Sequence, residues 1–60
     1  MKARIFGAGS IGNHLSNALR ELEYQVEVVD IDENALKRME KDIYPSRYGE
    51  WDKNISLLKE

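Results

Sequence analysis

The chain has 60 residues, no cysteine, one histidine and a formal net charge of −2, with nine Lys and Arg residues set against eleven Asp and Glu. This composition excludes a disulfide framework and a Cys/His zinc site. The interspersed charges lack the basic stripe typical of nucleic-acid binding, and no apolar run approaches the roughly 20 residues that cross a bilayer. We therefore expect a cytoplasmic protein with neither nucleic acid nor membrane as its partner.

The first half of the chain predicts a strand, a helix and a second strand. Residues 2–6, KARIF, favour a short strand that stops at Gly7, and residues 25–30, QVEVVD, favour another. Between them, residues 10–23 are expected to be helical. Their apolar side chains recur at helical spacing and form one stripe: Ile11, Leu15, Ala18, Leu19 and Leu22. The opposite side of this helix is polar and carries Asn13, Asn17, Arg20 and Glu21.

The second half predicts another helix and then a turn. Asp32 is the expected N-cap, and Pro45 ends the helix or lies just past its end. The inner face of this helix is apolar and consists of Ala35, Leu36, Met39 and Ile43. Residues 45–51, PSRYGEW, are expected to form a loop that turns at Gly49. For the tail, residues 52–60, we expect a short helix anchored by Trp51, with a strand over ISLLKE as the alternative.

Alternation of strand and helix is typical of an α/β fold with parallel pairing. The expected architecture is βαβα, the N-terminal half of a Rossmann domain with a doubly wound parallel sheet. The third strand of that half is expected to be missing, so residues 1–60 would be a partial domain, the N-terminal fragment of a longer enzyme. Two open sheet edges would remain, and we expect them to self-associate, giving a dimer.

Three glycines mark the turn between the first strand and the first helix. Gly7, Gly9 and Gly12 have the spacing G-x-G-x-x-G of dinucleotide-binding turns. Gly7 allows a tight turn, Gly9 lets the backbone approach a pyrophosphate, and Gly12 lets the helix pack near the strand. The backbone amides from Gly9 to Gly12 lie at a helix N-terminus, where an anion is favoured.

An acid follows at the expected distance. Asp30 ends the second predicted strand eighteen residues after Gly12, close to the roughly 20 typical of the acid that binds the ribose hydroxyls. A carboxylate accepts hydrogen bonds from a diol and repels a 2′-phosphate, so we expect NAD rather than NADP. Ile31 is placed to cover the adenine. The alternative is a glycine turn without a ligand, in which Asp30 only caps the second helix.

The segments KARIFGAGSIGNHLSNAL and VEVVDIDENAL resemble the start of NAD(P)-dependent oxidoreductases, and the glucose-fructose oxidoreductase and inositol dehydrogenase family most of all. The stretch DIYPSRYGEWD, residues 42–52, is similar to bacterial members of that family. The resemblance implies hydride transfer on a sugar or polyol derivative. It also implies that Ser10 and Ile11 contribute backbone amides. That family's catalytic residues lie beyond residue 60, so we expect no catalytic residue, no metal site and no activity in this piece alone.

Two other functions fit the same residues. A regulatory NAD sensor, such as those attached to potassium-uptake systems, also begins with a glycine turn and an acid after the second strand. The other function is an interaction module that binds no nucleotide. Under that hypothesis the three glycines and Asp30 would occur together by coincidence. His14 is expected on a solvated helix face, and Arg47 is expected to pack in a loop between Tyr44 and Tyr48.

Overall fold

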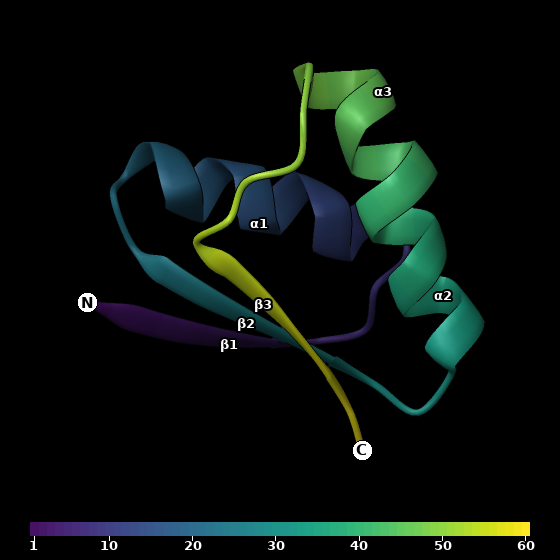
Figure 1. Cartoon of the computed structure of the whole chain (residues 1–60). Coiled ribbons are helices and arrows are strands. Elements are labelled where there is room, and N and C mark those ends of the chain that lie inside the picture. Colours follow the sequence, from purple (N-terminus) through teal and green to yellow (C-terminus); the bar gives the residue numbers. More distant parts are fainter.

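The structure, a computed structural model, describes all 60 residues and contains three strands and a series of helices. In chain order the elements are β1 (Lys2–Phe6), α1 (Ser10–Glu21), β2 (Gln25–Asp30), α2 (Glu33–Arg38), the π-helical turn η1 (Met39–Ile43), α3 (Tyr44–Tyr48) and β3 (Ile55–Lys59). The three strands form one parallel sheet in the order β1-β2-β3. All the helices lie on the same side of this sheet (Figure 1). The predicted fold class, an α/β Rossmann-type half with parallel strands, is confirmed.

The tail of the chain corrects two expectations. Residues 55–59 form β3, so the third strand is present and the expected short helix is not. Strand β3 pairs with β2 in a register that runs from Val26 opposite Ile55 to Asp30 opposite Lys59. The sequence ISLLK alone fits a helix or a strand, and pairing with β2 decides between them because it buries Ile55. The sheet still has two open edges, at β1 and at β3.

The second helix does not end at Pro45. Helical backbone continues from Glu33 to Tyr48 through α2, η1 and α3, and the expected loop begins only at Gly49. The π-helical turn lets a new helix start at Tyr44, so Pro45 occupies its first turn, where a missing N–H is tolerated. The predicted turn at Gly49 is confirmed, because its φ of 99° is a left-handed value that favours glycine.

The core lies between the sheet and the second helical segment. Val26, Val28 and Ile55 of the sheet pack with Leu36, Met39 and Tyr44, together with Ala8. Leu36 and Met39 were expected on the inner face of their helix and are buried there. Trp51 packs edge-on against Tyr44, with ring centroids 5.3 Å apart, and so anchors the chain before β3 as expected.

Helix α1 buries a different face from the one that its sequence pattern predicts. It ends at Glu21, and its buried residues are Gly12, Asn13 and Ser16. Most of the expected apolar stripe is exposed: Ile11 is 76% exposed and Leu22 is 68% exposed. The reason is the close approach of α1 to β1, because a Cβ atom on Gly12 would overlap the carbonyl oxygen of Gly7. Only small or compact side chains fit at this contact, so the large apolar ones turn away from the sheet.

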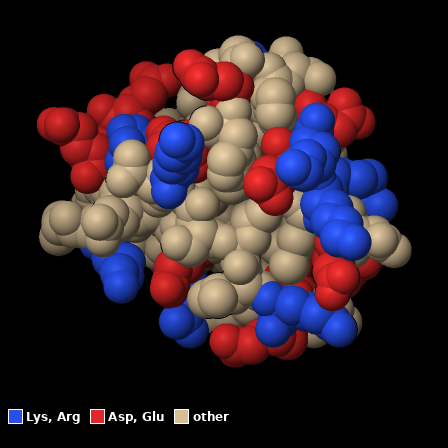
Figure 2. Space-filling view, in the orientation of Figure 1, with Lys and Arg blue, Asp and Glu red and all other residues tan.

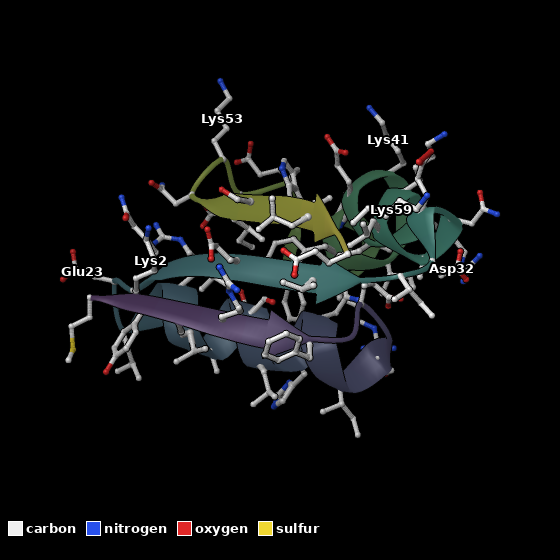
Figure 3. All side chains as sticks on the ribbon, turned by 90° about the horizontal axis from the view of Figure 1, so that it is seen from below. Lys2, Glu23, Asp32, Lys41, Lys53 and Lys59 are labelled. Atoms are coloured by element: carbon white, nitrogen blue, oxygen red, sulfur yellow. The ribbon has the colours of Figure 1, made fainter.

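The face of the sheet opposite the helices is uncovered (Figure 3). Lys2 marks the amino-terminal end of the strands in this view, and Lys59 and Asp32 mark the carboxyl-terminal end. Arg4 and Glu27 pair in register on this face and form an ion pair of 3.0 Å. The next row toward the carboxyl ends is apolar and consists of Phe6, Val29 and Leu58.

Candidate functional site

The glycine turn joins β1 to α1 at the carboxyl end of the sheet. Gly7 has a φ of 111°, which side chains other than hydrogen rarely allow, and its N–H donates to the Val29 carbonyl at 2.7 Å. Gly12 lies against the Gly7 carbonyl, so any side chain at Gly12 would push α1 away from β1. These two glycines shape the turn and bring the first turn of the helix close to the strand.

The amino end of α1 offers unpaired hydrogen-bond donors. The backbone N–H groups of Gly9, Ser10, Ile11 and Gly12 make no hydrogen bond within the chain, and Gly9, the N-cap, provides no side-chain cap. No atom lies within 4 Å of where a Cβ on Gly9 would be. The amino end of α1 therefore combines four donors with the positive end of the helix dipole and open space. This combination suits an oxyanion such as a diphosphate.

Asp30 lies directly beside this turn. Its Oδ2 accepts a hydrogen bond of 2.9 Å from the N–H of Ala8, and its Oδ1 accepts one of 2.9 Å from the N–H of Asp32. These backbone donors, Asp32 first and then Ala8, hold the pKa of Asp30 below its ordinary range. The carboxylate is ionised at neutral pH. Two donors occupy part of its roughly four acceptor positions, so about two remain for the hydroxyls of a ligand.

Asp32, and not Asp30, caps the second helix, as the sequence predicts. Asp32 caps α2, since its Oδ1 accepts a 2.9 Å hydrogen bond from the N–H of Asn34. Asp30 makes no hydrogen bond to α2, and its side chain is turned toward the glycine turn. Asp30 is therefore not the cap of the second helix.

The other predicted site residues flank the turn. Ser10 and Ile11 form the first turn of α1, and Ile31, just past the end of β2, is 79% exposed. A hollow of about 510 Å³ lies on the β1 side of the turn. Its lining includes the glycine turn and several apolar side chains: Ile5, Phe6, Ile11 and Leu15. The turn thus separates this apolar hollow from the acid at the end of β2.

Three residues near the turn were not assigned to it from the sequence. Ala8 donates to Asp30, a contact between distant segments that no local residue pattern indicates. Asn13 was placed on a polar outer face, but it is buried behind the turn. Arg47 lies in helix α3 rather than in a loop, and one guanidinium nitrogen is 3.5 Å from the Ser10 carbonyl oxygen. His14 is exposed, as expected.

The site fits the family to which the sequence is similar. A family model of the TrkA-N domain matches residues 3–60. The chain belongs to the TrkA-N domain family. TrkA-N domains are Rossmann-like domains that bind a dinucleotide. Searches among curated proteins and among solved structures each found no match to this TrkA-N chain.

The rest of this TrkA-N domain shows no second site of comparable design. No three His, Cys, Asp or Glu side chains come together to hold a metal ion, and no helix has the length and apolarity to span a membrane. A second hollow of about 430 Å³ lies between α1, α3 and the loop before β3, and its lining includes Asn17, Tyr48 and Trp51. On the face shown in Figure 2, acidic and basic side chains alternate around the margin of an uncharged centre.

Proposed function

We propose that the chain binds NAD, with the diphosphate on the N–H groups of the glycine turn and the adenosine ribose on Asp30. Gly7 and Gly12 shape the turn, and Gly9, Ser10 and Ile11 present the donors. The observation that carries this proposal is the 2.9 Å hydrogen bond between Asp30 and the N–H of Ala8, which places an ionised acid beside the four unpaired donors. In this role Ile31 covers one face of the adenine.

Asp30 also favours NAD over NADP. Its remaining acceptor positions suit the two ribose hydroxyls, and its negative charge opposes a 2′-phosphate at the same place. The next residue, Ile31, offers no charge to compensate. An NADP site would need a cation or a small polar residue here.

Titration with NAD and with NADP tests this role. We expect NAD to bind more tightly to the unaltered chain, and we expect Asp30→Ala to narrow the difference by weakening NAD binding. Asp42→Ala, which removes an exposed acid elsewhere, should leave both affinities unchanged and serves as the control. Equal affinity of the unaltered chain for the two dinucleotides would contradict the role of Asp30.

We propose two uses of bound NAD. The TrkA-N match supports regulation, in which NAD shifts a conformational equilibrium without reacting. The resemblance of residues 42–52 to sugar oxidoreductases supports hydride transfer to or from a sugar or polyol. Reduction of NAD in the presence of sugars would establish the enzyme. NAD-dependent protection from proteolysis without turnover would establish the sensor.

We also propose that the chain self-associates through the β1 edge. The outward-facing peptide groups of this strand are unpaired, and beside it lies the exposed apolar surface of α1, formed by Ile11, Leu15, Ala18 and Leu22. This surface is on the flank of α1 opposite Asn17, which contacts Tyr44. A second copy would pair the edge and cover the apolar residues together.

Sedimentation of Leu22→Ser tests the association. We expect this substitution to weaken the dimer. Ile31 is another strongly exposed apolar residue but lies outside the surface, so Ile31→Ser should not weaken it. A monomeric unaltered chain at high concentration would refute the proposal.

A further inference from the structure

Asn13 is a polar side chain enclosed behind the glycine turn, with no solvent exposure. Its side-chain nitrogen Nδ2 donates two hydrogen bonds, one of 3.1 Å to the Ala8 carbonyl and one of 2.8 Å to the Gly9 carbonyl. Both partners are acceptors, so the donating end of the amide must face them. The other end, Oδ1, is buried without a hydrogen-bond partner.

Stability alone does not explain an asparagine here. A buried polar atom without a partner costs about 1–3 kcal/mol, and Asn13 carries one in its Oδ1. An apolar side chain of similar size would remove that atom and leave the Ala8 carbonyl without its amide donor instead. The Gly9 carbonyl would keep its hydrogen bond of 2.9 Å from the backbone N–H of residue 13. With asparagine the unpaired oxygen is Oδ1 of residue 13, and with an apolar side chain it would be the Ala8 carbonyl oxygen. Asparagine therefore stabilises the fold little more than an apolar side chain of similar size would.

What the side chain adds is the orientation of the peptide between Ala8 and Gly9 and a second restraint on the peptide between Gly9 and Ser10. The chain has no cis peptide bond, and in a trans peptide the C=O and the N–H point in opposite directions. Asn13 holds the Ala8 carbonyl toward the interior, so the N–H of Gly9, in the same peptide, points outward. It adds a second hydrogen bond to the Gly9 carbonyl, which the backbone N–H of residue 13 also holds, so the N–H of Ser10 points outward too.

These two N–H groups belong to the four unpaired donors of the turn. If either peptide rotated, a carbonyl oxygen would replace a donor at the surface, and its partial negative charge would repel an anion. Asp30 fixes only the peptide before them, through the N–H of Ala8. The Ala8 carbonyl has no other hydrogen-bond donor in the chain, whereas the Gly9 carbonyl is also held by the backbone N–H of residue 13.

We propose that Asn13 is a positioning residue for diphosphate binding, which keeps the N–H of Gly9 turned toward the ligand and reinforces the orientation of the Ser10 N–H. Asn13 does not touch the ligand and acts only through the backbone. The inference rests on the proposed function of the turn as a diphosphate site.

The test compares a ligand that has a diphosphate with one that lacks it. NAD and adenosine are titrated into the 60-residue chain by NMR, and affinities are taken from backbone amide shifts. In Asn13→Asp the side chain keeps its shape, but an ionised carboxylate cannot donate to the two carbonyls. We expect NAD binding to weaken at least tenfold, and adenosine binding, which depends on Asp30, to stay within twofold.

Two more variants complete the comparison. Asn13→Ala also removes the donor and replaces Asn13→Asp if the buried acid prevents folding. Asn17→Asp is the matched control, because Asn17 is on the same helix and its Oδ1 accepts from the Tyr44 hydroxyl, a bond that aspartate retains. Asn17→Asp should bind NAD as the unaltered chain does.

The outcomes separate this inference from the function on which it rests. Undiminished NAD binding in the Asn13 variants would overturn the positioning role alone. An equal loss of NAD and adenosine binding would also overturn it, because a general structural defect weakens both. No NAD binding by the unaltered chain would overturn the proposed function and the inference together.

Discussion

The contact between Gly12 and Gly7 predicts that Gly12→Ala destabilises the chain, although alanine normally stabilises a helix. In an unhindered helix interior, alanine is about 1 kcal/mol better than glycine. At Gly12 the added Cβ would overlap the Gly7 carbonyl oxygen, which belongs to backbone held by the 2.7 Å hydrogen bond from the Gly7 N–H to Val29. Overpacking costs about 1–3 kcal/mol, and rigid backbone favours the upper end. The net loss is about 2 kcal/mol.

Urea unfolding followed by far-UV circular dichroism measures this loss, and Gly9→Ala is the matched control. A Cβ on Gly9 has no atom within 4 Å, so this variant should lose less than about 1 kcal/mol, the scale of an N-cap change. The same Cβ would project into the space in front of the unpaired donors, so NAD binding should fall. If Gly12→Ala proved as stable as the unaltered chain, the close packing of α1 on β1 would be refuted.

Three further predictions concern stability. The pKa of Asp30 is lower in the folded chain than its ordinary value, so its contribution to stability is complete above about pH 4 and is lost as the pH falls further. Asp30→Asn should therefore lose less stability between pH 7 and pH 3 than the unaltered chain, as measured by urea midpoints. Asp52→Ala breaks the 2.8 Å ion pair with Arg20, which is only partly exposed. The free energy of unfolding, measured by thermal unfolding, should fall by about 1 kcal/mol, and Lys53→Ala is the neutral control. Met39→Ala leaves a cavity at a fully buried position and should lower the free energy of unfolding by about 2–5 kcal/mol. This loss is enough to abolish cooperative unfolding in a domain this small. Unchanged cooperativity would contradict the packing around Met39.

Local patterns were sufficient where one segment decides its own structure. The strands at residues 2–6 and 25–30 have the predicted bounds, and Asp32 caps its helix, because short apolar runs and caps depend on neighbours in sequence. Local patterns failed where contacts between distant segments decide the structure. ISLLK became a strand by pairing with β2, and Pro45 was accommodated by a π-helical turn that no residue spacing indicates.

The candidate site shows the same division. The glycine spacing and Asp30 could be identified from the sequence because each has a fixed place relative to the first two strands. Asn13 could not, because helical periodicity assigned it to the polar side of α1. That assignment assumed that large apolar side chains turn toward the sheet, whereas the contact between Gly12 and Gly7 admits only compact residues. The close approach of the α1 and β1 backbones, rather than the hydrophobic pattern, therefore decides which face of α1 is buried.

The central place of β2 has a consequence for biosynthesis. Val26 lies between Ala3 on one side and Ile55 on the other, so the middle strand takes its two neighbours from opposite ends of the polypeptide. A nascent chain has β1 and β2 available early, but it cannot finish the sheet until the residues of β3 have been synthesised. With translation at about 5–20 residues per second, the half-made sheet waits a few seconds for its last strand. During that interval the edge of β2 that pairs with β3 has no hydrogen-bond partner.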